Sequence, residues 1–184
     1  MNLTWEELNR HIQACTRCPL AAGITNKVPG QGNREARLML IGEGPGAQED
    51  ASGLAFVGAA GQLLTRMLEA ISLTRDDVFI ANVVKCRPPG NRAPLPEEIA
   101  TCLPFLRGQT ALIRPQVILL LGATAVRTVQ GPDKRITRFS FRAVGPLFDI
   151  HRFDVCGRIT GPDSAELWTD ENGRLTMKAV VGFE

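Results

Sequence analysis

The stretch Leu38-Met-Leu-Ile-Gly-Glu-Gly-Pro-Gly46 decides the fold of this 184-residue chain. It begins as a short apolar run that stops at a glycine-rich turn, which is typical of a strand buried on both faces of a parallel sheet. Two similar steps follow, because the apolar run 78–84 leads into a proline-rich loop and the run 117–121 leads into Gly122-Ala-Thr124. This rhythm predicts a doubly wound parallel sheet, with any site beyond the carboxyl ends of its strands.

Helical signals surround these runs. Thr4 and Glu7 form a capping box that predicts a helix from Trp5 to about Ala14, and Pro96 opens a helix toward Ile113. A further helix is predicted to turn one apolar face inward, and its apolar positions are Leu63, Leu64, Met67, Leu68 and Ile71. The expected fold class is therefore α/β, with three layers α/β/α around a central parallel sheet.

The pattern changes near Phe139, where helical periodicity gives way to short alternating segments. Asn172-Gly173 between two such segments predicts a β-hairpin. We therefore expect an α/β core over residues 1–138 and an atypical β-rich segment over residues 139–184, packed on or extending the same domain.

Composition limits the class of protein. The chain is 44% hydrophobic and 22% charged, which is typical of a globular domain and excludes a disordered one. Residues 81–142 hold ten Lys and Arg against three Asp and Glu, whereas residues 43–80 hold six acids against two Arg. This asymmetry indicates an anionic partner. Without a secretory signal or an apolar run long enough for a bilayer, we expect a cytoplasmic protein with no membrane partner.

The five cysteines are not expected to form disulfides in a reducing compartment. Cys15 and Cys18 form a C-x2-C unit in a polar loop, Cys86 opens the proline-rich loop, and Cys102 follows sixteen residues later. Four thiolates can hold one metal centre, and their spacing fits either structural zinc or an iron–sulfur cluster. The alternative, buried cysteines acting as small hydrophobes, suits the isolated Cys156 but not Cys15 and Cys18, because those two lie in a polar loop.

Polar residues at the ends of the predicted strands are candidates for chemistry. Gly42 and Gly44 let backbone amides approach a ligand, and Glu43 between them is placed to polarise a water. The alternative is a sharp turn at the strand exit. Asn82 interrupts an apolar strand, and its amide can bind the edge of a nucleobase. The alternative there is an Asn that caps a neighbouring loop.

Phe56 lies between glycines, so it is a candidate for stacking on a planar ligand or for anchoring the core. Lys85, Arg87 and Arg92 belong to a basic loop that we expect to be exposed and suited to phosphates. A solvated surface is the alternative for these three side chains.

Taken together, these segments resemble the family 4 uracil-DNA glycosylases, the iron–sulfur branch of the uracil-DNA glycosylase superfamily. The resemblance covers about residues 8–138, in the order and spacing of the family. The matching stretches are Cys15-x2-Cys18-Pro19-Leu20, Gly42 to Gly46 followed by Glu49-Asp50, Gly53 to Gly61, Asn82 to Arg92, Pro96-Glu-Glu98, Cys102, and Gly122-Ala-Thr124-Ala125.

The resemblance implies an enzyme that hydrolyses the N-glycosidic bond of flipped deoxyuridine in DNA to start base excision repair. Glu43 would contact uracil and assist the water, Phe56 would stack on the base, and Asn82 would bind its Watson–Crick edge. Gly42 and Gly44 would complete the base site. The implied partner is uracil-containing DNA, single- or double-stranded, bound by a monomer.

The resemblance also implies a cofactor and DNA contacts. A [4Fe-4S] cluster would be held by Cys15, Cys18, Cys86 and Cys102, with structural zinc as the alternative. The basic loop residues Lys85, Arg87 and Arg92 would contact the DNA.

One family motif is missing. The family carries a C-terminal His-Pro pair whose histidine donates to the uracil carbonyl, and no His-Pro pair occurs in this sequence. The two histidines are His11, in the first predicted helix, and His151, which we expect to be a surface residue. Loss of one such donor typically costs ~10²–10³ in rate. The alternative function is therefore a catalytically impaired relative that binds uracil or damaged DNA and retains the cluster.

Overall fold

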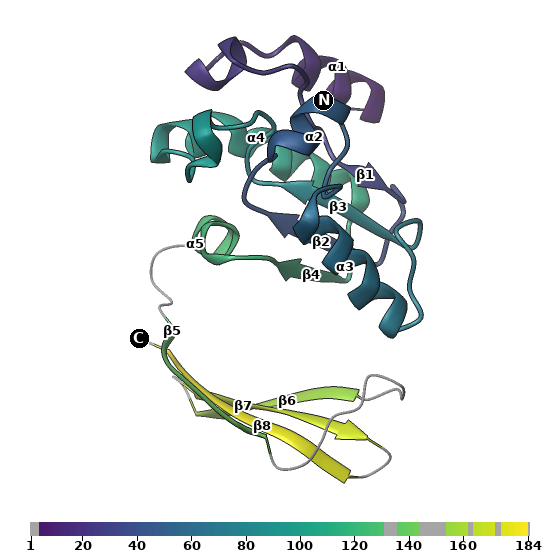
Figure 1. Ribbon diagram of the computed structural model, residues 1–184, viewed down its shortest axis with the longest axis vertical. Helices are drawn as coiled ribbons and strands as arrows, with labels where there is room; N and C mark the ends of the chain where they lie inside the picture. The colour runs from purple at the N-terminus through teal and green to yellow at the C-terminus, as the bar shows by residue number, and fades with distance from the viewer. Residues whose placement is uncertain (1–3, 131–135, 144–153, 162–163, 172–173, 184) are drawn as a thin grey trace. The chain divides into compact units, whose positions relative to one another are not determined.

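The computed structural model describes residues 4–130, 136–143, 154–161, 164–171 and 174–183, and for the last four ranges it describes the backbone. The chain divides into two compact units, Met1–Val129 and Gln130–Glu184 (Figure 1). Among the described residues, no helix combines the length and apolarity needed to cross a membrane.

The first unit is built on a four-stranded sheet. Strand β2 pairs in parallel with β3 on one side and β4 on the other, and β1 joins antiparallel to β3. These pairings confirm the predicted parallel sheet. Strand β3 ends at Asn82, however, whereas the apolar run in the sequence continues to residue 84. The strands are β1 (Gln31–Gly32), β2 (Leu38–Gly42), β3 (Val78–Asn82) and β4 (Val117–Leu120).

The helices of this unit begin close to where the sequence predicts. In the first helix the Glu7 amide donates to Thr4 Oγ1 at 3.3 Å, and the Thr4 amide donates to Glu7 Oε2 at 2.8 Å, which confirms the capping box. The helices are α1 (Trp5–Ala14), α2 (Ala47–Ser52), α3 (Ala59–Ala70), α4 (Pro96–Ile113) and α5 (Ala123–Gln130), with 3-10 turns at Pro19–Ala22 and Pro89–Asn91.

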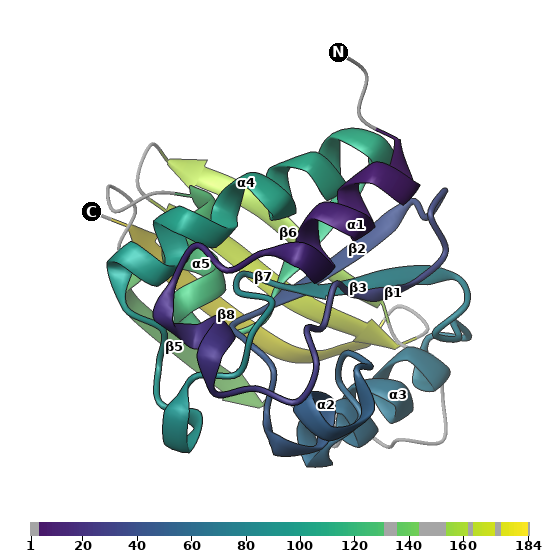
Figure 2. The same cartoon turned by 90° about the horizontal axis from the view of Figure 1, so that it is seen from above.

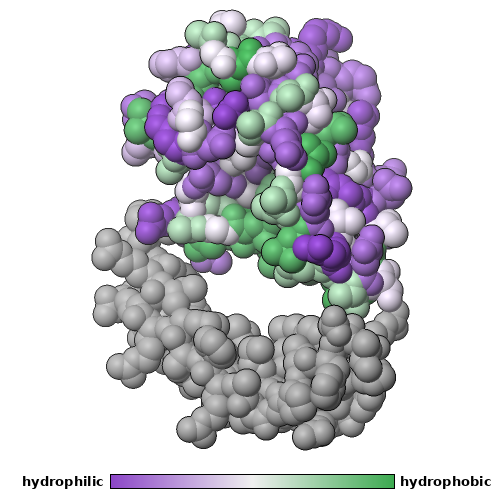
Figure 3. Space-filling model, viewed as in Figure 1, coloured by the Kyte–Doolittle hydropathy of each residue, from purple (hydrophilic) through white to green (hydrophobic). Residues whose placement is uncertain are grey.

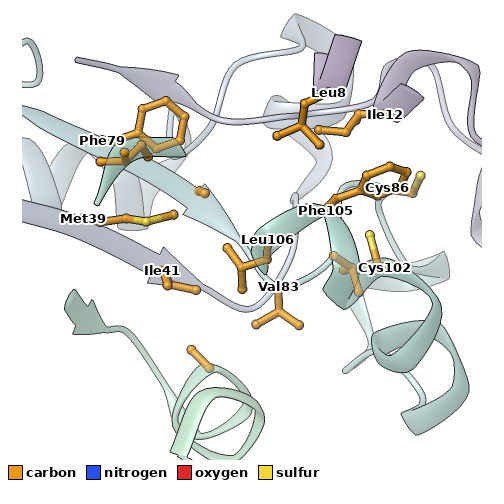
Figure 4. Packing of buried hydrophobic residues seen from close by; sticks show 14 of the residues in the cluster. Leu8, Ile12, Met39, Ile41, Phe79, Val83, Cys86, Cys102, Phe105 and Leu106 are labelled. Carbon is orange, nitrogen blue, oxygen red and sulfur yellow. The ribbon is translucent and has the colours of Figure 1, made fainter. Parts of the chain in front are cut away.

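Side chains of β2 and β3 alternate between two hydrophobic clusters, because successive residues of a strand point to opposite faces. Met39 and Phe79 join the cluster that contains residues of α1 and α4, where Leu8 and Leu106 lie (Figure 4). The opposite face packs against α3 through a second cluster of Val28, Leu40, Ala55, Leu64, Leu68, Val78 and Ile80. Helices thus cover both faces of the sheet (Figure 2), which confirms the α/β/α layers.

Helix α3 differs from the expectation of one buried apolar face. Leu64 and Leu68 are buried, whereas Leu63, Met67 and Ile71 are half exposed. The buried and the half-exposed residues form two neighbouring stripes, each with a spacing of four residues. Because α3 packs against the sheet on one side only, the stripe of Leu64 and Leu68 faces the sheet and the other stripe does not. Figure 3 shows hydrophobic side chains gathered toward β4 in this unit, where Val117 and Leu119 are also exposed.

The second unit is an antiparallel sheet in the order β5-β8-β7-β6. Its strands are β5 (Ile136–Ala143), β6 (Asp154–Gly161), β7 (Ser164–Glu171) and β8 (Arg174–Phe183). The pairing of β7 with β8 runs to Glu171 opposite Arg174, as predicted for a hairpin. Cys156 lies in β6 opposite Trp168, whereas His151 falls outside the described residues. The β-rich character is confirmed, with the unit beginning at residue 130.

Candidate active site and cysteine pocket

The carboxyl ends of β2 and β3 meet at the candidate active site. Gly42 lies opposite Asn82 in the parallel register, and the Val83 amide donates to the Gly42 carbonyl at 2.8 Å just beyond the strand end. The Val84 amide then donates to the Glu43 carbonyl at 3.2 Å. The first glycine-rich turn and the loop after Asn82 are therefore joined through their backbones.

Asn82 carries the clearest chemical signal of this site. Its residue is 1% exposed, and its Oδ1 atom has no hydrogen-bond partner among the residues that the structure describes. A buried carbonyl oxygen without a donor costs about 1–3 kcal/mol, so such atoms are rare in native proteins. The atom does not cap a loop, and it is free to accept a hydrogen bond from a ligand.

Gly42 brings the Phe56 ring and the Asn82 amide together. A Cβ atom at position 42 would lie 2.6 Å from Asn82 Oδ1 and closer still to the Phe56 ring. Any side chain there would displace both groups. The strand therefore ends in glycine because an aromatic ring and an amide converge on its backbone. Phe56 also packs against the second hydrophobic cluster, as expected for a core anchor, and its stacking on a planar ligand stays a prediction.

The loop that carries Phe56 has a strained backbone, which the Arg75 side chain stabilises. Phe56 has φ +54°, a left-handed conformation that is uncommon for a residue other than glycine. Arg75 stabilises it, because its guanidinium donates to the Ala55 carbonyl at 2.6 Å and to the Phe56 carbonyl at 3.1 Å. Gly61 packs so tightly beneath Phe56 that a Cβ atom there would overlap the Phe56 backbone.

Glu43 projects from the turn after β2 and is half-buried. One oxygen of its carboxylate, Oε2, accepts a hydrogen bond from the Thr124 hydroxyl in the first turn of α5. Its other oxygen has no partner among the hydrogen bonds of the described residues. Glu43 can therefore accept a further hydrogen bond, and its role in assisting a water stays a prediction.

The four cysteines of the predicted metal site line one small pocket. Cys15 and Cys18 come from the loop after α1, Cys86 from the loop after β3, and Cys102 from α4. Figure 4 shows the Cys86 and Cys102 sulfur atoms on neighbouring segments of the core. Within the described ranges, no three or more His, Cys, Asp or Glu side chains adopt a metal-binding arrangement. The fold brings the four thiols to one pocket, although the described side chains are not arranged as metal ligands.

The chemistry of this donor set suits a metal centre. Burial, together with the neighbouring Cys102 and Cys18 thiols, raises the pKa of Cys86 to about 12. Burial likewise raises the pKa of Cys102. Burial acts the same way on Cys15, but hydrogen bonds and charge from Arg17 outweigh it and bring that pKa below its usual value. Buried thiolates repel one another, so a cationic centre among them would stabilise the charged forms.

Comparison with known proteins identifies the family of this chain. The family model described as "Uracil DNA glycosylase superfamily" matches residues 29–169. This chain belongs to the uracil-DNA glycosylase superfamily. The match extends into the second unit. It reaches past residue 138, the end of the stretch that resembles the family 4 enzymes.

Several Type-4 uracil-DNA glycosylases are similar to this superfamily member. The protein of Thermotoga maritima is 49% identical over 134 residues, which cover 72% of this chain and 70% of the relative. The protein of Archaeoglobus fulgidus is 45% identical over 149 residues, covering 80% and 74%. The protein of Pyrobaculum aerophilum is 47% identical over 156 residues, covering 85% and 76%.

The basic loop of this superfamily member differs from the sequence-based expectation at Lys85. That side chain is 1% exposed, and its Nζ donates to the Asn82 carbonyl at 2.8 Å and to Gln109 Oε1 at 2.7 Å. Burial, partly offset by the nearby Cys102, lowers the pKa of Lys85 to about 8. The expectation of an exposed, phosphate-binding Lys85 is therefore wrong, since its ammonium is bonded inside the protein.

That Arg87 and Arg92 contact DNA stays a prediction. Arg87 is half-buried, and its Nε donates to Asn91 Oδ1 at 2.7 Å. Arg92 forms a two-point ion pair with Glu98 at 2.7 and 2.9 Å, and this partner raises the pKa of Arg92. Both side chains keep N–H groups that these bonds do not use.

Glu49 is a site residue to which the sequence reasoning gave no role. Its buried carboxylate accepts backbone N–H bonds from Gly46 at 3.0 Å and from Val57 and Gly58 at 2.8 Å each. Burial raises the pKa of Glu49, but these hydrogen bonds outweigh it and lower the pKa below its usual value. One signal was available, because a glutamate three residues after the helix-capping Gly46 is the second half of a capping box.

Proposed function

We propose that this chain hydrolyses the N-glycosidic bond between uracil and deoxyribose in DNA and so begins base excision repair. The observation that carries the proposal is the buried Asn82 Oδ1 without a partner beside Gly42 and the Phe56 ring. Superfamily membership and the similarity to Type-4 uracil-DNA glycosylases support the same reaction.

The Asn82 amide suits uracil better than cytosine. Uracil presents an N3–H donor and an O4 acceptor, which match the Oδ1 acceptor and Nδ2 donor of one amide. Cytosine presents an N3 acceptor and an N4 amine, so the same amide would meet donor against donor and acceptor against acceptor. A buried amide that cannot turn freely would therefore reject the normal base.

Hydrolysis then requires that the base leave the DNA stack, which costs a few kcal/mol and least for mispaired or single-stranded uracil. As the C1′–N1 bond breaks, the sugar becomes oxocarbenium-like and uracil departs with the bonding electron pair. Glu43 would hold a water against C1′ through its second carboxylate oxygen and accept its proton as the new C1′–O bond forms. Backbone N–H groups of the glycine-rich turn would stabilise the uracil anion.

We propose that Cys15, Cys18, Cys86 and Cys102 hold a [4Fe-4S] cluster, with structural zinc as the alternative. The donor set supports this, since four thiols from three separate segments line one pocket. When bound, such a centre would supply thiolate–metal bonds that cross-link these segments. The cysteines would thereby hold the loop after β3, and with it Asn82, against α4.

The partner would be uracil-containing DNA, single- or double-stranded, bound by a monomer in the cytoplasm. The excess of Lys and Arg over residues 81–142 would supply phosphate contacts and make binding salt-dependent. Arg87 and Arg92 remain candidates for such contacts, whereas Lys85 is excluded by its burial.

The experiment is incubation of the purified chain with an oligonucleotide that contains one uracil, followed by alkaline cleavage of abasic sites. We expect strand cleavage from the wild type, none from a matched cytosine oligonucleotide, and a large loss in Asn82→Ala and Glu43→Ala. Salt-sensitive DNA binding without product would instead favour the impaired binding relative, which the absence of a His-Pro pair from the sequence suggests.

Iron and sulfide analysis of the same preparation tests the cofactor. A brown protein with broad absorbance near 400 nm that is lost in Cys86→Ala supports the cluster. A colourless preparation with one zinc ion per chain would overturn it in favour of zinc.

A further inference from the structure

Thr124 contacts Glu43 from the first turn of α5. Its hydroxyl donates to Glu43 Oε2, which lies on a different strand–loop segment 81 residues earlier. In α3 and α4, Thr65, Thr101 and Thr110 donate their hydroxyls to the carbonyl four residues back. Thr124 is the second residue of α5, so the carbonyl four residues before it belongs to β4 and not to the helix. Its hydroxyl is therefore available to a long-range partner, and that partner is Glu43.

The backbone around Thr124 fixes the hydroxyl in place. The Leu121 amide donates to the Ile41 carbonyl at 2.8 Å, which ties the end of β4 to β2 immediately before Glu43. Gly122 then turns the chain with φ +92°, and the fully buried Ala125 anchors α5 in the core. Thr124 therefore reaches Glu43 from a rigid support.

On the opposite side, the Val84 amide holds the Glu43 carbonyl at 3.2 Å. The backbone of Glu43 is thus fixed by the loop after β3, and one carboxylate oxygen is fixed by α5. A glutamate side chain has three rotatable bonds, and a hydrogen bond at one oxygen restricts the direction in which the other can accept.

We propose that Thr124 is a positioning residue for Glu43, holding Oε2 so that Oε1 faces the water that attacks the sugar. This inference rests on the proposed function of Glu43. Thr124 does not touch the substrate in this account, and it acts through the orientation of the carboxylate. The step between β4 and α5 thereby becomes part of the active site, although it contributes no group to the reaction itself.

The test compares Thr124→Val, which keeps the shape and removes the hydroxyl, with Thr124→Ser, which keeps the hydroxyl. Thr128→Val, one turn further along α5, is the matched control. Under single-turnover conditions with a uracil oligonucleotide, we expect a roughly 10- to 100-fold lower rate for Thr124→Val. Thr124→Ser and Thr128→Val should stay within about threefold of the wild type, and DNA affinity should be unchanged in all three. The melting temperature should fall by a few degrees in Thr124→Val alone, because one hydrogen bond to a carboxylate is lost, so rates are compared at a temperature where every variant is folded.

A Glu43→Ala background distinguishes positioning from a general structural effect. If Thr124 acts through Glu43, then Thr124→Val adds no further loss there, because the two effects belong to one unit. A full additional loss in that background would overturn the proposal, as would an unimpaired Thr124→Val in an active wild type. An inactive wild type would contradict the proposed function separately.

Crystal structures of the wild type and Thr124→Val provide a readout that needs no activity. We expect one Glu43 side-chain position with Thr124 Oγ1 in hydrogen-bond contact in the wild type, and several positions in the variant. A wild-type structure in which the two groups do not touch, or an unchanged Glu43 in the variant, would refute the inference.

Discussion

Replacing Glu49 by Gln tests how the loop that carries Phe56 is supported. The Glu49 carboxylate accepts three backbone N–H bonds, two at Oε1 from Val57 and Gly58 and one at Oε2 from Gly46. A glutamine keeps one oxygen for the first pair but places an NH2 group against the Gly46 amide. One charge-assisted hydrogen bond is lost and a donor–donor contact takes its place.

The expected loss follows from that geometry. A hydrogen bond to a charged group contributes about 1.5–3 kcal/mol, so the free energy of unfolding should fall by roughly this amount. For a chain of this size the melting temperature should fall by roughly 3–12 °C. Because Val57 and Gly58 directly follow Phe56, we also expect slower uracil excision at temperatures where the variant is still folded.

The pH dependence of Glu49→Gln has a defined sign. The net pKa of Glu49 lies below its usual value of 4.5, so its ionised form stabilises the folded state. This stabilisation is fully present above about pH 4.5 and is lost as the pH falls through the lower pKa of the folded protein. The stability difference between wild type and variant should therefore be constant near neutral pH and shrink in acid.

Thermal and urea denaturation between pH 3 and pH 8 measure this difference, alongside excision rates. Glu69→Gln, an exposed glutamate on α3, is the matched control and should change neither quantity. Wild-type stability and excision in Glu49→Gln would refute the conclusion that the carboxylate holds the loop.

Three further predictions concern the surroundings of the site. Lys85→Met removes the donor to the Asn82 carbonyl and Gln109, and urea denaturation should show a loss of about 1–3 kcal/mol with little change in DNA affinity. Arg87→Ala should leave stability unchanged but lower the slope of log affinity against log salt by about 1, measured by fluorescence anisotropy, and an unchanged slope would remove Arg87 from the DNA interface. Gly61→Ala places a Cβ atom into the Phe56 backbone, so both melting temperature and excision should fall, and a variant that behaves like the wild type would contradict the packing described for this loop.

The sheet and the edge that holds the candidate site were predictable because short-range chemistry specifies them. Apolar runs that stop at Gly42 and near Asn82 predict buried parallel strands, and the ends of such strands lie at one edge. The sequence offered Phe56 as a stacking residue or a core anchor, and only the fold shows that its ring lies against Gly42 at this edge.

Long-range partners could not be predicted in the same way. Lys85 looks like part of a basic surface loop, and only the fold places Gln109 where it can accept from a buried ammonium. The contact between Thr124 and Glu43 likewise depends on the parallel pairing of β2 with β4. On α3, spacing identified the apolar residues, but the choice of the stripe containing Leu64 depends on how the helix packs.

The most direct test of the central claim is the amount of free base released from DNA. Duplexes that differ only in one uracil or cytosine, each with that base radiolabelled, are incubated with the wild-type chain and with Asn82→Leu, and the released base is separated by chromatography. We expect the wild type to release uracil and no cytosine. The rate of uracil release should be at least 100-fold lower for Asn82→Leu, because removal of one fully buried recognition group typically lowers the rate by about this factor. Wild-type protein that binds the uracil duplex but releases no base, or release that does not depend on Asn82, would contradict the account.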